Sequence, residues 1–218
     1  MRVNEVIDMA DIHDPQDESN KLSRRDMIKT VIAAGTVCST GYVIRSGLHA
    51  FAATPGAVER LITLNVNGRQ RPVDVMKQET LAMTLRYKLG LTGTKLACDR
   101  AECGSCTVLI DDIPQYSCSV LTHTTRGKKI LTIEGLAAED GTLHPVQRGV
   151  VEEQGFQCAF CMSGFIMSTV GFLKTNPNPT RAELARGVSG NLCRCQDYDK
   201  ILTSLVRGVE LSRGVKHV

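Results

Sequence analysis

Nine cysteines are the residues of this chain whose type and spacing point most directly to chemistry. Cys38 stands alone near the amino end, and the other eight form two groups of four. The first quartet is Cys98, Cys103, Cys106 and Cys118, and the second quartet is Cys158, Cys161, Cys193 and Cys195. Sets of four thiolates are ligands of iron–sulfur clusters and of structural zinc. Two metal centres are therefore expected.

The first quartet has the spacing C-x4-C-x2-C-x11-C. Its first three cysteines match the spacing that plant-type ferredoxins use to hold a [2Fe–2S] cluster. Such a cluster needs backbone N–H groups directed at its sulfur atoms, and small residues let the backbone come close. The loop supplies small residues at Gly93, Ala97, Ala101, Gly104 and Ser105.

The second quartet has the spacing C-x2-C-x31-C-x1-C, and each of its pairs precedes an expected helix. One helix is expected to begin near Met162 and the other near Tyr198. Helix N-termini carry partial positive charge and favour an anionic centre. Arg194, between the last two cysteines, adds a full positive charge. This quartet also predicts a [2Fe–2S] cluster.

Disulfides, structural zinc and buried structural thiols are the alternative interpretations of these cysteines. Disulfides suit an exported chain, but a chain of this size can build a core without them. Zinc favours two separated C-x2-C pairs, which the C-x-C pair and the x4 loop do not match. Buried thiols without a metal would not fall into quartets.

The elements around the first quartet predict strands packed on one helix. A hairpin is expected from 61–66 and 72–76 around the turn Asn67-Gly68, then a helix over 79–89 that ends at Gly90. Strands are expected over 107–110 and 129–133, with a turn at Asp111-Asp112 and Pro114. This order predicts a β-grasp domain over 53–135.

After Gly135 the apolar period becomes helical. Four helices are expected, over 144–154, 162–174, 181–188 and 199–212, and they define a helical domain over 136–218. Thr180 and Glu183 form a capping-box pair at the start of the third helix, and His144 is a helix-start residue. The predicted fold class is therefore α+β, with a β-grasp domain followed by a four-helix domain.

Composition fits a folded chain with two compact units. The 218 residues are 42% hydrophobic and 22% charged, which is close to the average for globular proteins. The net charge of +3 is too balanced for a nucleic-acid binder, and tryptophan is absent. We find no nucleophile triad, phosphate-binding glycine loop or dinucleotide-binding motif, so no catalytic residues are assigned to this chain.

Residues 1–52 resemble a twin-arginine export signal. A polar stretch leads to Arg24-Arg25, the weakly apolar run Thr30–Ile44 follows, and Ala50-Phe51-Ala52 offers a cleavage site. Met27 departs from the usual Phe of that motif, and a surface helix or tail is the alternative. The signal predicts a periplasmic protein exported after folding, which suits thiolates that are loaded with metal in the cytosol. The membrane is then involved only through export or an electron acceptor.

Four segments resemble the small iron–sulfur subunit of molybdenum hydroxylases, the family of xanthine oxidase, aldehyde oxidoreductase and aerobic carbon monoxide dehydrogenase. They are Gly93-Thr94-Lys95, Cys103-Gly104-Ser105-Cys106-Thr107-Val108, Gly155-Phe156-Gln157-Cys158 and Ser189-Gly190-Asn191-Leu192-Cys193-Arg194-Cys195. The resemblance runs from about Leu61 to the carboxyl end. Several positions depart from it. Ala97, Ala101 and Ala159 replace common glycines, which suggests a negative φ there, and Met162-Ser163 and Gln196-Asp197 are unusual.

The resemblance implies an electron-transfer subunit with two [2Fe–2S] clusters. The second quartet would lie near a molybdopterin cofactor in a separate large subunit, where Gln157 hydrogen-bonds the pterin and Cys195 approaches it. The first quartet would face the acceptor, a flavin subunit or a c-type cytochrome. The oxidised substrate, an aldehyde, a purine, another N-heterocycle or carbon monoxide, would be bound by the large subunit. The alternatives are a free-standing ferredoxin-like carrier and a structural zinc protein.

Overall fold

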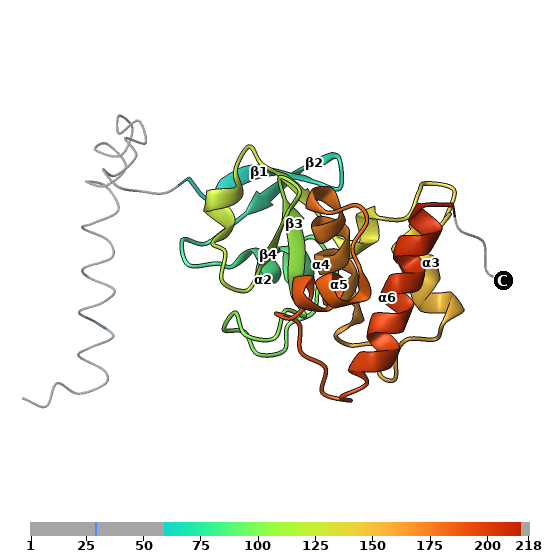
Figure 1. The fold of residues 1–218 in the computed structure, drawn as a ribbon. Helices are drawn as coiled ribbons and strands as arrows, with labels where there is room; N and C mark the ends of the chain where they lie inside the picture. Colours follow the sequence, from blue (N-terminus) through green and yellow to red (C-terminus); the bar gives the residue numbers. More distant parts are fainter. Residues whose placement is uncertain (1–28, 30–58, 215–218) are drawn as a thin grey trace, which may run out of the picture. The chain divides into compact units, whose positions relative to one another are not determined.

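The computed structural model describes Lys29 and residues 59–214, and the described part from Glu59 onward belongs to one compact unit (Figure 1). The predicted export signal and Cys38 lie outside the described residues, apart from Lys29. None of the described helices is both long enough and apolar enough to cross a membrane.

A mixed five-stranded sheet forms the first half of the described chain. Its strands are β1 (Leu61–Val66), β2 (Arg69–Asp74), β3 (Thr107–Ile110), β4 (Ile113–Tyr116) and β5 (Lys129–Leu131), in the order β2-β1-β5-β3-β4. The β1–β5 pair is parallel, and the other neighbours are antiparallel. The parallel pair brings the start and the end of this half of the chain together at the centre of the sheet.

The predicted hairpin is present. Asn67 and Gly68 both have positive φ, 54° and 73°, as a type I′ turn requires. Ile62 pairs with Val73 in the antiparallel register, and both are buried. The return strand begins at Arg69, three residues before the predicted Pro72, because the two-residue turn lets pairing start at once.

Strand β4 was not predicted, because Pro114 reads as a turn residue. In the sheet β4 is an edge strand, where proline needs no ladder partner for its missing N–H. Pro72 occupies the opposite edge strand, β2. The predicted strand over 129–133 is shorter in the structure, and Ile133–Gly135 forms a 3-10 turn, η4.

The predicted helix over 79–89 is present in two parts, α2 (Leu81–Met83) and a π-helical segment η2 (Thr84–Lys88). Thr80 caps its start by accepting from Met83 N. The amide of Leu89 donates to Thr84 O, five residues back, at 3.0 Å. Gly90 ends the helix with φ 69°, as predicted. The spacing of the apolar residues does not distinguish this π turn from an α-helix.

Four helices follow the sheet: α3 (Pro145–Glu152), α4 (Met162–Thr175), α5 (Arg181–Gly187) and α6 (Tyr198–Ser212). All of them fall within two residues of the predicted positions. His144 and Thr180 cap α3 and α5 with capping boxes to Gln147 and Glu183. A short 3-10 segment, η3 (Thr122–Thr125), precedes β5.

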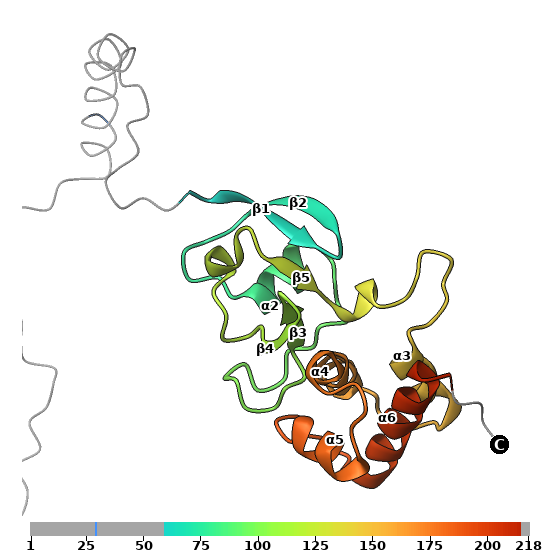
Figure 2. The same cartoon turned by 45° about the horizontal axis from the view of Figure 1, so that its top comes forward.

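Helix α4 joins the two halves of the described chain. It packs on β3 and β4 with one side and on α5 and α3 with others, and Figure 2 shows it end-on between the sheet and the remaining helices. Leu109 of β3 belongs to the helical core rather than to the core between the sheet and α2. The domain boundary at residue 135 stays a prediction.

Candidate functional site: two cysteine quartets

The first quartet is held by a loop that curls between η2 and β3, with Cys118 just after β4. Cys106 and Cys118 are buried, whereas Cys98 and Cys103 are partly exposed. The amide of Ala101 donates to Cys118 Sγ at 3.3 Å, and those of Glu102 and Cys103 donate to Cys98 Sγ at 3.4 Å each. Amides directed at sulfur stabilise negative charge, so the loop fits the thiolates of an anionic cluster.

Two alanines in the cysteine loops adopt the backbone conformation of glycine. Ala101 has φ 60° and Ala159 has φ 59°, so the expectation of negative φ at these positions is wrong. A left-handed non-glycine residue costs about 1–2 kcal/mol, which the surrounding contacts must offset. Both alanines thus take a left-handed backbone conformation that glycine would adopt more easily.

Two thiols of the first quartet have pKa values shifted in opposite directions. Burial raises the pKa of Cys98, but backbone hydrogen bonds from Arg100, Glu102 and Cys103 outweigh it and lower the pKa to about 7. Burial raises the pKa of Cys106 to about 12, and the neighbouring Cys118 adds to this effect. The surroundings of Cys98 therefore favour its thiolate, whereas those of Cys106 favour the protonated thiol.

The second quartet lies where two helices begin, as predicted. Cys161 is the N-cap residue of α4, and Cys193 and Cys195 precede α6. The Sγ atoms of Cys158 and Cys195 are 3.5 Å apart near the surface, while Cys161 and Cys193 are buried. Burial and the neighbouring Cys193 raise the pKa of Cys161 to about 12. This quartet also pairs a buried side with a surface side.

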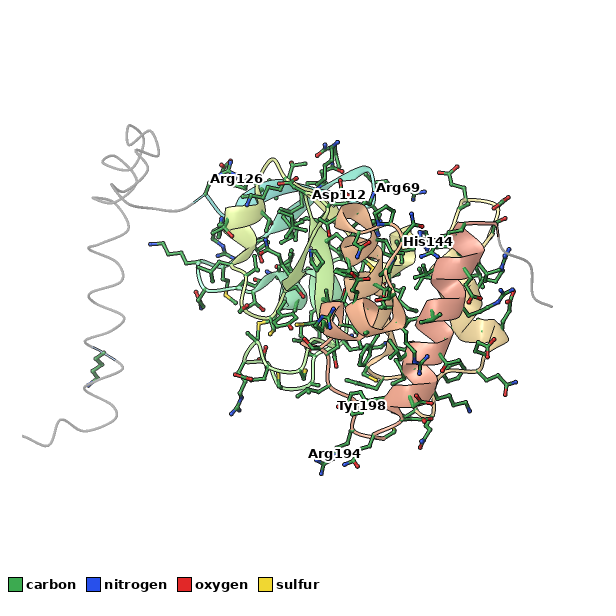
Figure 3. The ribbon with its side chains drawn as sticks, in the orientation of Figure 1. Arg69, Asp112, Arg126, His144, Arg194 and Tyr198 are labelled. Carbon is green, nitrogen blue, oxygen red and sulfur yellow. The ribbon has the colours of Figure 1, made fainter. Side chains whose placement is uncertain are left out.

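Gln157 lies on the surface beside the outer cysteines of the second quartet. Its Nε2 donates to Asp197 Oδ2 at 3.4 Å. Large apolar side chains are exposed in the same segments: Phe156, Phe160, Leu192 and Tyr198. In Figure 3 Arg194 and Tyr198 lie at the same end of the molecule, and Arg194 points outward. Gln157 is therefore accessible to another molecule.

The two quartets face one cavity of about 810 Å³. Cys98 and Cys103 line it from the sheet side, and Cys158, Cys161 and Cys193 line it from the helical side. The spacing of the cysteines could not predict that the two quartets share one cavity, because the residues between the quartets fold into separate elements. In the described part of the chain all eight cysteines are free thiols. No three potential ligand side chains among these residues are close enough to enclose one metal ion.

Comparison with known families assigns both halves to iron–sulfur proteins. Residues 64–130 match a family described as a 2Fe-2S iron-sulfur cluster binding domain. Residues 132–205 match a second family, described as a [2Fe-2S] binding domain. Each match contains one complete quartet. The family models therefore indicate iron–sulfur clusters rather than zinc.

The aldehyde oxidoreductase iron-sulfur-binding subunit PaoA of Escherichia coli K12 is 39% identical over 88% of this chain and 90% of its own length. The nicotine 6-hydroxylase small subunit of Paenarthrobacter nicotinovorans is 42% identical over 70% of this chain and 92% of its own length. The crystal structure of quinoline 2-oxidoreductase from Pseudomonas putida 86 aligns with a TM-score of 0.67, at 37% identity, over 72% of this chain and 98% of that chain.

These matches define a class, the [2Fe–2S] proteins of oxidoreductase complexes. The chain belongs to the iron–sulfur subunits of the molybdenum hydroxylase family, of the aldehyde oxidoreductase and xanthine dehydrogenase type. The resemblance predicted from the four sequence segments is confirmed. Electron transfer within an oxidoreductase complex follows from this membership.

Proposed function

We propose that each quartet holds one [2Fe–2S] cluster and that the chain passes single electrons from a molybdopterin centre in a large partner subunit to an acceptor. Electrons enter at the second quartet and leave from the first. The observation that carries this proposal is one cavity lined by cysteines of both quartets, two from the first and three from the second, with each quartet inside its own matched family model. In fold terms, we assign the sheet with α2 and η2 to the β-grasp class.

The second quartet is the better candidate for contact with the large subunit. Phe156 and Phe160 flank its outer cysteine Cys158, and each exposes at least 40% of its surface. Aromatic residues are enriched in the centres of protein interfaces. Gln157 lies in the same segment with its amide accessible, which suits a role as a hydrogen-bond partner of the pterin. Cys195 is the other residue that we place toward the pterin.

The names of the relatives favour aldehydes and N-heterocycles as the substrates of the whole complex. They include an aldehyde oxidoreductase subunit, a nicotine 6-hydroxylase subunit and a nicotinate dehydrogenase subunit. The large subunit would bind the substrate and carry out its oxidation. For the acceptor we propose a flavin subunit or a c-type cytochrome. A periplasmic location is proposed from the Arg24-Arg25 segment alone.

Metal analysis combined with EPR spectroscopy of the purified complex tests this function. We expect four iron atoms and four labile sulfides for each copy of this chain, and two distinct rhombic signals after reduction. Cys118→Ser and Cys158→Ser should each alter one signal and leave the other intact. A single signal that integrates to one spin, or zinc in place of iron, would contradict the proposal. Isolation as a stable monomer with full cluster content would favour the free-standing carrier.

A further inference from the structure

Residues 190–192, which we call the strap, connect the helical half directly to the loop of the first quartet. Asn191 Nδ2 donates to Gly104 O at 3.0 Å, and the amide of Leu192 donates to Cys103 O at 2.9 Å. Tyr116 Oη donates to Gly190 O at 2.9 Å. Three hydrogen bonds thus join segments that lie more than 70 residues apart in the sequence.

The strap lies so close to the loop and to Tyr116 that a side chain on either of two glycines would collide with a neighbour. A Cβ on Gly104 would approach Gly190 O to 2.8 Å, and a Cβ on Gly190 would clash with Tyr116 Oη. Gly104 also has φ 69°, which favours glycine. Asn191 is 3% exposed, so its hydrogen bond is shielded from water. The hydrogen bond between this buried side-chain amide and the Gly104 carbonyl holds the two loops in one arrangement.

This contact is relevant to electron transfer because of the residues at its two ends. Cys103 is a ligand of the first quartet, and Leu192 immediately precedes Cys193, a ligand of the second. One hydrogen bond and one peptide unit therefore separate the backbones of two cysteines that serve different quartets. Electron transfer requires no bond to form or break here. With a cluster in each quartet, the cluster in the second quartet would lose one electron and the cluster in the first would gain it.

We propose that the strap fixes the relative placement of the two quartets and provides the hydrogen-bonded contact for electron transfer between them. Asn191 and Tyr116 are positioning residues in this arrangement, because they act on Gly104 and Gly190 rather than on a ligand sulfur. The proposal rests on the proposed function, since it requires a cluster in each quartet. The proposal gives the strap, a Gly-Asn-Leu segment without a ligand residue, a role in electron transfer.

The test uses the intact complex with Asn191→Ala, and with Tyr116→Phe as a milder variant that removes only a hydroxyl. Two unpaired spins in one molecule split or broaden each other's EPR lines to a degree set by their distance and orientation. When both centres are reduced, we expect the splitting or broadening of the EPR lines to become smaller in both variants, or to vary more from molecule to molecule. Each lost hydrogen bond should raise the population with a detached strap about two- to tenfold. Hydrogen exchange at the Leu192 amide should rise accordingly.

Asn178→Ala and Tyr87→Phe are matched controls that make the same chemical changes at exposed positions outside the strap. They should leave the spin interaction and the exchange of the Leu192 amide as in the wild type. Wild-type spin interaction in Asn191→Ala and Tyr116→Phe, with both centres present, would overturn the proposal. Absence of a second centre in the unmodified complex would instead overturn the proposed function. Iron content and the number of signals separate these two outcomes.

Discussion

Gln157 is the side chain that we place between this chain and the pterin. Its exposed position predicts that Gln157→Ala changes stability by less than about 0.5 kcal/mol and leaves iron content near wild type. A lost hydrogen bond to the cofactor costs about 0.5–1.5 kcal/mol, enough to slow turnover up to about tenfold. Stopped-flow measurement of cluster reduction by substrate checks this expectation. Gln78→Ala, another exposed glutamine, is the control, and wild-type rates in Gln157→Ala would remove the pterin contact from the proposal.

Glu79 is a buried carboxylate whose surroundings keep it charged. Its Oε2 accepts from Lys88 Nζ at 2.6 Å, and its Oε1 accepts from the hydroxyl of Thr84 at 2.8 Å. Burial raises the pKa of Glu79, but these bonds and the amide of Met76 outweigh it, so the pKa lies below the usual 4.5. The unfolded chain therefore binds more protons than the folded chain between the two pKa values. Stability from this group is complete above the unfolded value and is lost as pH falls through the folded one.

Glu79→Gln should lower the free energy of unfolding by about 1–3 kcal/mol at pH 7, because charge-assisted bonds are lost in a buried site. The difference from wild type should shrink as the pH falls below about 4.5, where the wild-type carboxylate becomes protonated. Thermal unfolding followed by circular dichroism at several pH values measures both effects. Glu139→Gln is the control, because Glu139 is fully exposed. Parallel pH profiles for wild type and Glu79→Gln would contradict this account.

At the level of single residues, cysteine spacing divided the eight cysteines into two groups of four, and each group falls inside one matched family model. Their role as cluster ligands stays a prediction. Asn191 and Tyr116 could not be found this way. Their partners are backbone carbonyls of Gly104 and Gly190, and a carbonyl has no identity in the sequence. Ala101 illustrates the same limit, because its positive φ is imposed by the surrounding loop against its own preference.

Helices α3 and α6 pack backbone to backbone at a pair of glycines. A Cβ on Gly149 would approach Gly208 Cα to 2.6 Å and Ser204 O to 2.7 Å. Alanine normally favours a helix over glycine by about 1 kcal/mol, but here the methyl group would push the helices apart. We expect Gly149→Ala to destabilise the protein by about 1–3 kcal/mol and to lower the thermal midpoint by several degrees. Val151→Ala, at an exposed position of α3, should change it little. A midpoint raised in Gly149→Ala would contradict this packing.

Among the elements, the four helices and the hairpin were predictable because period, caps and turn residues agree locally. Thr180 with Glu183 and Asn67 with Gly68 each specify a boundary by their own chemistry. Strand β4 and the π turn at Thr84 instead involve contacts with residues that are distant in the sequence. Pro114 is acceptable only because β4 is an edge strand, and the hydroxyl of Thr84 meets that of Thr122, 38 residues away.

We propose that the protein crosses a membrane in its folded state, directed by the Arg24-Arg25 segment. Arg24→Lys combined with Arg25→Lys should retain the protein in the cytoplasm with its iron still bound. The reason is that the arginine pair acts as an export signal and does not contribute to folding. Fractionation of cells followed by iron analysis of the retained protein measures this. Arg2→Lys, the same change outside the pair, serves as the control. Unchanged periplasmic recovery of the double variant would mean that the segment is not the signal, or that a partner subunit carries it.

The two prolines on the outer strands determine how other chains can attach to the sheet. Pro72 in β2 and Pro114 in β4 each remove one N–H from an edge, which interrupts the row of donors that an added strand would need. Association by strand addition is therefore disfavoured at both edges. We therefore expect a partner chain to recognise this protein through side chains on its faces and loops, and the same interruptions should disfavour edge-to-edge aggregation of newly made chains.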